Sequence, residues 1–347
     1  MLQELTASLK AEAHRLGFTM AGACPAVSPS GLDRLGEWLA LGYGGEMEYL
    51  ANRAAAYEHP RHVLEGVRSL LLLALPYQTE VPLPCEAGQG RISRYAWGPG
   101  DYHDVIHDRL KKLGACLQSL SPTALWRGVV DSAPLLEREF ALRAGLGWIG
   151  KNTLLLNREN GSYFFLAALL TDQELAYDQP HAADHCGSCT ACLDACPTAA
   201  FPQPYVLDAR KCISYLTIEL RGEIPPELRP GIGDWLFGCD ICQEVCPWNR
   251  FATSSTLAEL QPSSSPPTNP VDLCELFALD EAAFRRRFRY TPLWRAKRRG
   301  ILRNAAIVLG NQRAVSANAA LQRGLLDDEP LVREACAWAL ARIRSSD

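Results

Sequence analysis

The chain lacks any apolar run long enough to cross a membrane. Its longest runs, Leu70–Leu75 and Tyr163–Leu170, have six and eight residues, whereas a membrane-spanning helix needs about twenty. The first 18 residues have the pattern of an amphipathic helix, and they contain neither the apolar core of a signal peptide nor a twin arginine. We therefore expect a cytoplasmic protein without a membrane partner. No apolar interface stands out in the sequence, so we also expect a monomer.

Acidic residues are absent from one stretch, although the whole chain carries a net charge of −4. Arg285–Arg303 contains nine Lys and Arg residues and no Asp or Glu. Such a run can be a solvated face, but within a mildly acidic protein it favours a local contact with a nucleic acid. The candidate phosphate contacts are Arg285, Arg286, Arg287, Arg289, Lys297, Arg298 and Arg299. The aromatic residues of this stretch, which can stack on bases or pack beneath the helices, are Phe284, Phe288, Tyr290 and Trp294.

Thirteen cysteines are too many for chance, and a cytoplasmic chain does not use them for disulfides. Eight of them fall between Cys186 and Cys246, and this clustering indicates metal binding. The remaining five are scattered singly, and we expect them to be small core residues. These five are Cys24, Cys85, Cys116, Cys274 and Cys336.

The first cysteine motif, Cys186–Pro197, has the spacing C-x2-C-x2-C-x3-C-P of bacterial ferredoxins. Two-residue gaps let three successive thiolates converge on neighbouring irons of one 4Fe–4S cube. The fourth cysteine of such a motif starts a helix and points away, and in two-cluster proteins it binds the other cluster.

The second motif, Cys239–Pro247, lacks one cysteine of the standard run, and Cys212 stands alone upstream as its replacement. The predicted ligands of cluster one are Cys186, Cys189, Cys192 and Cys246. The predicted ligands of cluster two are Cys196, Cys212, Cys239 and Cys242. Paired C-x2-C motifs also bind zinc, but zinc would need neither the C-x3-C-P tails nor this crosswise sharing.

The first 180 residues alternate β-rich apolar segments with helical periodicity, which predicts an α/β domain whose central sheet is covered on both faces. The expected strands are Phe18–Ala23, Ser69–Pro76, Leu125–Asp131, Thr153–Leu156 and Tyr163–Leu170. The expected helices are Leu2–Leu16, Ser30–Leu41, Tyr102–Leu120 and Pro134–Ala144.

The C-terminal part has a helical pattern from Pro270 onward. Two of its segments, Gly300–Gly310 and Pro330–Ile343, share a leucine or valine, an arginine and a small-residue helix. This similarity predicts a pair of HEAT-type repeats, with an ordinary helical cap as the alternative. The expected fold is therefore multi-domain, of mixed α+β and α class. It comprises an α/β domain at 1–180, a two-cluster ferredoxin-like module at 181–252 and a helical HEAT-like repeat domain at 270–347.

Five motifs together resemble the epoxyqueuosine reductases, whose architecture is similar to that of the corrinoid reductive dehalogenases. They are VDSAPLLE from Val130, GLGWIGKNTLLL from Gly145, HCGSCTACLDACPT from His185, RKCISYLTIEL from Arg210 and GCDICQEVCPWNRF from Gly238. The resemblance covers nearly the whole chain in a consistent order, and the repeats of the tail fit it.

The resemblance implies that the 1–180 domain binds cobalamin, with its cobalt near one cluster. It implies that cob(I)alamin, fed by the two 4Fe–4S clusters, reduces the epoxide of epoxyqueuosine to queuosine. The substrate is the wobble position of tRNA, held through its anticodon stem-loop, and the reaction is the last step of queuosine biosynthesis. An external low-potential donor must supply the electrons.

Asp131 is the candidate proton donor. It ends an expected strand, where α/β sheets place their active sites, and the resemblance puts the family's catalytic aspartate here. An acid that works near neutral pH needs a raised pKa, and Val129, Val130 and Pro134 are apolar neighbours that favour one. The alternative is that Asp131 only caps the following helix.

The candidate cobalamin contacts are Arg94, Trp97, Ser132, Lys151, Asn152 and Thr153. The Gly150–Thr153 turn combines a glycine, which allows close approach, with polar side chains that can bind the amides of the cofactor. A solvated turn is the alternative. Arg94 and Trp97 belong to a polar and aromatic patch with Tyr102 and His103, which is expected to line the same cleft.

Two other functions remain as alternatives. A corrinoid reductive dehalogenase would use the same cofactors on a small organohalide, but it would leave the basic stretch unexplained. A cobalamin-free ferredoxin fused to a helical scaffold would not need the 180-residue domain. Corrin absorbance and binding to an anticodon stem-loop would separate these possibilities.

Overall fold

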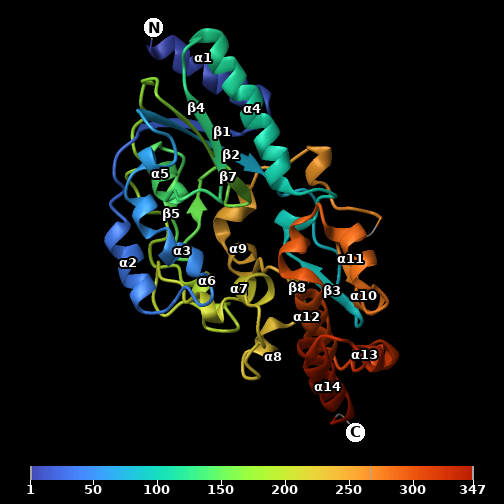
Figure 1. Cartoon of the computed structure of the whole chain (residues 1–347). Helices are drawn as coiled ribbons and strands as arrows, with labels where there is room; N and C mark the ends of the chain where they lie inside the picture. The colour runs from blue at the N-terminus through green and yellow to red at the C-terminus, as the bar shows by residue number, and fades with distance from the viewer. Residues whose placement is uncertain (1, 266, 346–347) are drawn as a thin grey trace.

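The computed structural model describes residues 2–265 and 267–345. Its largest sheet has the order β1-β2-β7-β4, formed by Met20–Pro25, Ser69–Pro76, Phe164–Thr171 and Trp126–Val130. Every neighbouring pair in this sheet is antiparallel. Four of the five expected strands are therefore present in one sheet (Figure 1).

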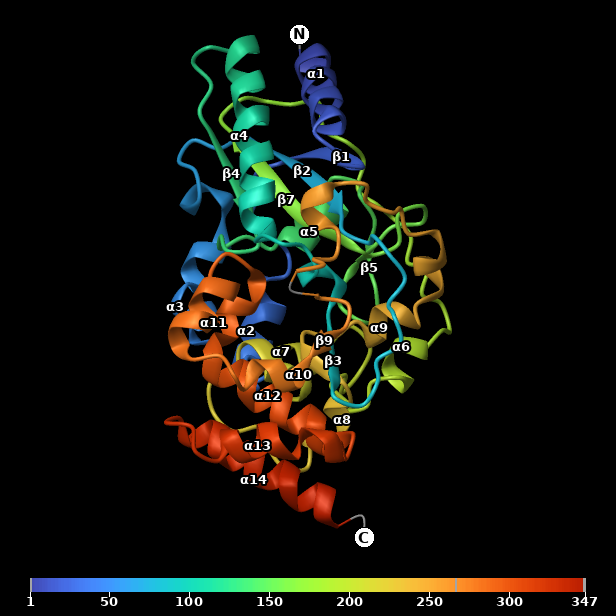
Figure 2. The same ribbon diagram turned by 90° about the vertical axis from the view of Figure 1, so that its right-hand side faces the viewer.

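Helices cover both faces of this sheet, as predicted. Leu71, Leu73 and Leu75 of β2 pack with α1 (Leu2–Arg15) and α4 (Tyr102–Leu120) on one face. Leu70, Leu72 and Ala74 of the same strand pack with α5 (Glu137–Arg143) on the other face. Because both faces are covered, β2 is a continuous apolar run rather than an alternating one. The two layers are visible in Figure 2.

The fifth expected strand, Thr153–Leu156, is shorter than predicted and lies outside the main sheet. It is reduced to β6 (Leu155–Leu156), which pairs with β5 (Trp148–Ile149) in a small hairpin. Gly147 has φ of 157° and leaves no room for a side chain, because a Cβ there would lie 2.0 Å from the Leu156 carbonyl oxygen. The hairpin holds the turn at 150–153 against the cysteine-rich segment.

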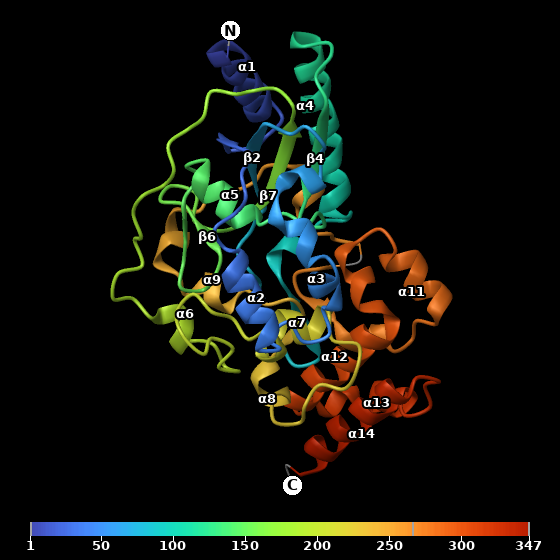
Figure 3. The ribbon, with the colours of Figure 1, turned by 60° about the vertical axis from the view of Figure 1, so that its left-hand side comes forward.

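Two further helices of the first 180 residues, α2 (Leu32–Ala40) and α3 (Glu48–Asn52), extend away from the sheet toward that segment (Figure 3). The Trp38 indole N–H donates to the Leu207 carbonyl at 2.6 Å. The Tyr215 hydroxyl lies 2.8 Å from the backbone nitrogen of Glu46, which donates to it. These bonds fix the first domain to the cysteine-rich one.

The cysteine-rich segment consists of short elements around two similar loops. These are α6 (Ala191–Asp194), α7 (Ile213–Ile218), α8 (Arg229–Ile232), β8 (Trp235–Phe237) and α9 (Ile241–Glu244). Helices α6 and α9, which contain the equivalent cysteines Cys192 and Cys242, pack against each other. A helix after each cysteine loop is the arrangement expected of a two-cluster module.

The C-terminal part is helical, as predicted, apart from the short strand β9 (Val271–Asp272). Its helices are α10 (Leu273–Leu276), α11 (Glu281–Phe288), α12 (Lys297–Asn311), α13 (Asn318–Gly324) and α14 (Pro330–Arg344). The two similar segments form α12 and α14, which pack along each other. The HEAT-like assignment itself stays a prediction.

A second sheet joins all three predicted domains. Strand β3 (Gln89–Ile92) lies between β8 and β9, parallel to the first and antiparallel to the second. One hydrophobic core contains Trp97, Leu236 and Leu302, one residue from each predicted domain. The domain boundaries at 180, 252 and 270 stay predictions. Among the described residues, no helix is both long and apolar enough to span a bilayer.

Candidate functional site

Asp131 lies directly after β4, at the edge of the main sheet that faces the C-terminal part. Its backbone has φ of 31°, in the left-handed region that non-glycine residues rarely adopt. Its side chain is 53% exposed. The Tyr102 hydroxyl donates a short hydrogen bond to Oδ2, and Nε2 of His103 lies 2.5 Å from Oδ1. Both partners come from the first turn of α4.

Two further charged side chains, those of Asp101 and Arg295, contact His103. Its Nδ1 lies 2.8 Å from Oδ1 of Asp101, the residue that caps α4. The Arg295 guanidinium, from the 3-10 turn at Pro292–Ala296, lies 2.8 Å from the same nitrogen and 3.7 Å from Oδ2 of Asp101. The basic stretch is thus in direct contact with the network around Asp131.

The sequence analysis predicted a raised pKa for Asp131, and this prediction is wrong. Partial removal from water alone would raise the pKa of this carboxyl, but hydrogen bonds from His103 and Tyr102, together with the nearby positive charges, lower it below its usual value. Burial alone lowers the pKa of His103, but its bonds to Asp101 and Asp131 raise it to about 9. At neutral pH the proton therefore resides on His103, and Asp131 is ionised.

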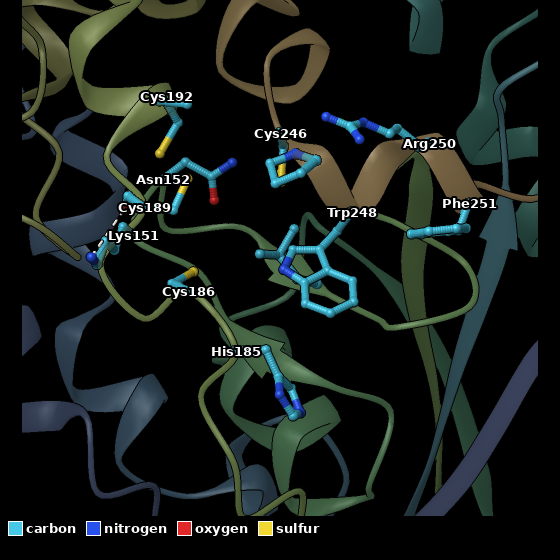
Figure 4. A pocket seen from close by; sticks show the side chains of 13 residues that line it. Lys151, Asn152, His185, Cys186, Cys189, Cys192, Cys246, Trp248, Arg250 and Phe251 are labelled. Atoms are coloured by element: carbon cyan, nitrogen blue, oxygen red, sulfur yellow. Dashed lines mark hydrogen bonds between the residues drawn. The ribbon is translucent and has the colours of Figure 1, made fainter.

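The four cysteines predicted to bind cluster one line one cavity of about 240 Å³. Figure 4 shows Cys186, Cys189, Cys192 and Cys246 around it, beside Trp248. Burial, together with the thiolates of Cys186, Cys246 and Cys189, raises the pKa of Cys192 to about 11. The second motif thus contributes its last cysteine to the first group, as the crossed assignment requires.

The other four cysteines form a second, more buried group. Burial raises the pKa of Cys242, and the thiolates of Cys212, Cys192 and Cys196 add to the effect. Burial also raises the pKa of Cys239, and the thiolates of Cys212 and Cys242 add to the effect. The structure therefore brings Cys196 and Cys212 to the loop of the second motif.

Two predicted cobalamin contacts need correction. The Trp97 side chain is only 2% exposed, and its indole N–H donates to the Ile92 carbonyl, so it is a core residue. Arg94 is also largely enclosed: its backbone N–H and guanidinium bind Asp240, between Cys239 and Cys242, and its Nη1 donates to the Tyr163 hydroxyl. Arg94 therefore holds the loop of the second cysteine group.

The polar residues of the turn at 150–153 and the loop after β4 mostly bind protein groups. Lys151 donates to the carbonyls of Gly187 and Cys189, at 2.6 and 3.0 Å. Asn152 is buried, and its Nδ2 lies 3.4 Å from the Cys242 carbonyl. Ser132 donates to the Val130 carbonyl. Thr153 has φ of 66°, and its carbonyl accepts a bond from Arg138.

The predicted phosphate contacts divide into two kinds. Arg298 is bound to Asp327 and to the Leu279 carbonyl, and Arg287 is half-buried near Glu275. Both side chains thus have protein partners, and their contact with tRNA stays a prediction. Phe284 and Phe288 are buried, whereas Tyr290 is exposed. The cations that remain exposed are Arg285, Arg286, Arg289, Lys297 and Arg299.

Comparison with known proteins decides the family. A family model described as epoxyqueuosine reductase QueG, DUF1730, matches residues 58–132. The epoxyqueuosine reductase of Pseudomonas aeruginosa is 45% identical over 343 residues, which cover 97% of this chain and 94% of that protein. The chain belongs to the epoxyqueuosine reductase family. The Escherichia coli epoxyqueuosine reductase is 39% identical over 350 residues, covering 98% and 90% of the two chains.

Solved epoxyqueuosine reductases share the fold over the same range. A crystal structure with an epoxyqueuosine-modified tRNA-Tyr stem loop matches with a TM-score of 0.89 at 32% identity, covering 98% of this chain and 90% of that one. The Bacillus subtilis epoxyqueuosine reductase matches with a TM-score of 0.88 at 32% identity and the same coverage. That protein was solved with the catalytic loop of an aspartate swung out of its active site.

The cysteine segment of this chain also has a family match of its own. A 4Fe-4S double cluster binding domain matches residues 185–249, which include all eight clustered cysteines. The prediction of iron–sulfur clusters is therefore confirmed, and the individual ligand sets stay a prediction. Sequence reasoning missed Asp101 and the contact of Arg295 with His103, because nothing in the local pattern links α4 to the basic stretch.

Proposed function

We propose that this protein reduces the epoxide of epoxyqueuosine in tRNA to queuosine, using cobalamin and two 4Fe–4S clusters. The observation that supports it best is the contact between Arg295 and His103, which joins the basic stretch to the Asp131 network. A tRNA bound along that stretch would present a loop base beside the acid. An external low-potential donor would supply electrons to a monomeric, cytoplasmic enzyme.

The cysteine groups fit two 4Fe–4S clusters. Cys186, Cys189, Cys192 and Cys246 would hold cluster one near the surface, where Cys189 is exposed. Cys196, Cys212, Cys239 and Cys242 would hold cluster two deeper in the molecule. Four-thiolate clusters cover the low potentials that this chemistry needs, in a range of roughly −700 to +450 mV.

The residues around Asp131 also fit a cobalamin ring. Glu137, the first residue of α5, has a buried Oε1 without a hydrogen-bond partner, and burial raises its pKa to about 8. Amide groups at the rim of a corrin could donate to this oxygen. Ser132 and Thr153 would complete the binding surface, with Thr153 held by Arg138. When bound, cobalamin would supply a strongly reducing, nucleophilic metal centre.

Asp131 and His103 would together provide the proton. Opening the epoxide leaves an alkoxide oxygen, which must be protonated before it can leave as water. The lowered pKa of Asp131 and the raised pKa of His103 leave the proton at neutral pH on His103, whose Nε2 lies 2.5 Å from Oδ1 of Asp131. We propose that the proton passes from His103 Nε2 through Asp131 to the substrate oxygen, while Asp101 holds the imidazole by its other nitrogen.

This proton pathway predicts a specific pH profile. The protonated form of His103 prevails below its pKa and is lost as pH rises through about 9, so kcat/KM should fall above that pH. His103→Asn should lower the rate and abolish this alkaline limb. His107→Asn, one turn further along α4, serves as the matched control and should keep the limb. An unchanged profile in His103→Asn would contradict the role of His103.

The exposed cations predict salt-sensitive tRNA binding. Arg286→Gln and Arg289→Gln should each weaken binding of an anticodon stem-loop and reduce the slope of log K against log salt by about 1. Arg344→Gln, at the far end of α14, should leave the slope unchanged. If all three variants show the same slope of log K against log salt, the tRNA binds to another surface of the protein.

The proposed reaction is tested by anaerobic reconstitution with iron, sulfide, cobalamin and a strong reductant. With epoxyqueuosine-containing tRNA, the mass of the modified nucleoside should fall by one oxygen atom. Omission of cobalamin should prevent this change. Turnover without a corrin, or an unchanged nucleoside with all components present, would overturn the proposal.

A further inference from the structure

The side chain of Arg303, the last cation of the basic stretch, is buried and does not face solvent. It is 1% exposed, in the middle of α12, a helix that packs against α7 and β8 of the cysteine-rich segment (Figure 1). Charged side chains at that depth are normally paired with an opposite charge. In the described part of the chain, however, every group that accepts a hydrogen bond from Arg303 is uncharged. Its positive charge is therefore left without a carboxylate in contact.

The guanidinium N–H groups of Arg303 are nevertheless satisfied by neutral oxygens. Nη1 donates to the carbonyls of Leu220 and Gly222 at 2.9 and 2.6 Å, and Nη2 donates to the Leu216 carbonyl at 2.6 Å. Nε and Nη2 also donate to Oδ1 of Asn304, at 3.0 and 2.9 Å. These bonds hold the guanidinium in one position and replace its lost hydration, but they leave its net positive charge intact.

This buried charge lies beside two predicted ligands of cluster two. Helix α7, whose last carbonyls bind Arg303, begins directly after Cys212. Nδ2 of Asn304 donates to the Thr217 carbonyl at 2.8 Å, and the Thr217 hydroxyl accepts a bond from the backbone N–H that directly precedes Cys239. At a rise of about 1.5 Å per helical residue, the guanidinium lies on the order of 10 Å from Cys212.

We propose that Arg303 supplies the counter-charge of cluster two and thereby raises its reduction potential. The proposal rests on the ligand sets given under the proposed function. Four thiolates give a 4Fe–4S cluster a net negative charge, and reduction adds one more electron where little water can screen it. A fixed cation at that distance stabilises the reduced state more than the oxidised state. Net charge is among the factors that set cluster potentials.

This placement suits the inner of the two clusters. Low solvent exposure by itself makes the added negative charge less favourable, so cluster two would otherwise be harder to reduce than cluster one. Two other arginines that contact this segment are each paired with an acid, Arg94 with Asp240 and Arg229 with Glu334. Arg303 therefore adds the net positive charge that favours electron transfer inward from cluster one.

The test is a redox titration of the protein with both clusters reconstituted, followed by electron paramagnetic resonance. Arg303→Gln should lower one of the two midpoint potentials. A tenfold change in the ratio of reduced to oxidised cluster corresponds to about 59 mV for one electron, and a shift of this order is expected. The affected signal should be the one that is missing from Cys239→Ser. Arg303→Lys keeps the charge and should keep the potential of the wild type.

The matched control is the double variant Arg229→Gln, Glu334→Gln. It removes another buried arginine that contacts the same segment, but it removes the acid partner too, so neither potential should change. An unchanged potential in Arg303→Gln, an equal fall in Arg303→Lys, or an equal shift of both clusters would overturn the proposal.

A second variant applies even if Arg303→Gln fails to assemble its clusters. Asn304→Asp keeps the oxygen that accepts from Nε and Nη2 of Arg303, but it gives the guanidinium an acid partner. This variant should lower the same potential, and the absence of a shift would refute the counter-charge. None of these measurements uses tRNA or cobalamin, so the result is independent of epoxide reduction.

Discussion

Asp131→Asn should lower the rate of epoxide reduction by about 10²- to 10⁴-fold, the usual contribution of a positioned general acid. The amide keeps the size of the side chain and can still bond to Tyr102. It cannot accept a proton from His103 and pass it on. The rate is measured with reconstituted protein and epoxyqueuosine-containing tRNA under single-turnover conditions, so that product release does not mask the chemical step.

Asp104→Asn is the matched control for this variant. Asp104 is an exposed carboxylate in the same first turn of α4, and its replacement should leave the rate unchanged. Iron content and stem-loop affinity should be normal in both variants. Full turnover by Asp131→Asn would remove Asp131 from the proton pathway and leave it as a residue of the loop after β4.

Cys196→Ser and Cys246→Ser should each eliminate one cluster, in each case the cluster opposite to their own sequence motif. Cys196 belongs to the first motif, yet its neighbours are Cys212 and Cys242. Cys246 belongs to the second motif, yet it lines the cavity of Cys186, Cys189 and Cys192. Both variants should lose all measurable turnover, because electrons must pass through both centres.

The lost cluster can be identified by comparing each variant with a variant of another cysteine from the same predicted ligand set. Cys196→Ser should give the same resonance spectrum as Cys239→Ser, and Cys246→Ser the same as Cys189→Ser. Cys116→Ser, at a partly buried position of α4 outside both cysteine groups, should retain the iron content and activity of the wild type. If variants of the same sequence motif instead give the same resonance spectrum, the crossed ligand sets are wrong.

The sequence predicted those parts of the molecule that depend on local pattern. The strands β2 and β7 are long apolar runs, and α4 has clear helical periodicity. The cysteine spacing likewise predicted the iron–sulfur clusters, because the loops that bind such clusters are short and contain most of their own ligands. In each case the residues that determine the structure are close together in the chain.

The features that sequence reasoning missed depend on distant residues. The pKa of Asp131 could not be predicted from Val129 and Val130, because it is set by His103 and by Arg295, and these two residues are themselves 192 positions apart. Arg298 appeared free because Asp327, its partner, lies outside the basic stretch. The local pattern also did not show that Trp97 would be covered by a core built from later segments.

The strand β3 has a consequence for how the protein matures. It leaves the ribosome early, but its two neighbours, β8 and β9, are synthesised much later. Next to it, Ser93 and Arg94 bind Asp240, which lies between Cys239 and Cys242. The nascent polypeptide therefore cannot close the scaffold around its inner iron centre until translation is almost finished. Cofactor insertion into this centre should accordingly be a late, post-translational event, and shortened proteins that lack one of the three strands should fail to retain iron.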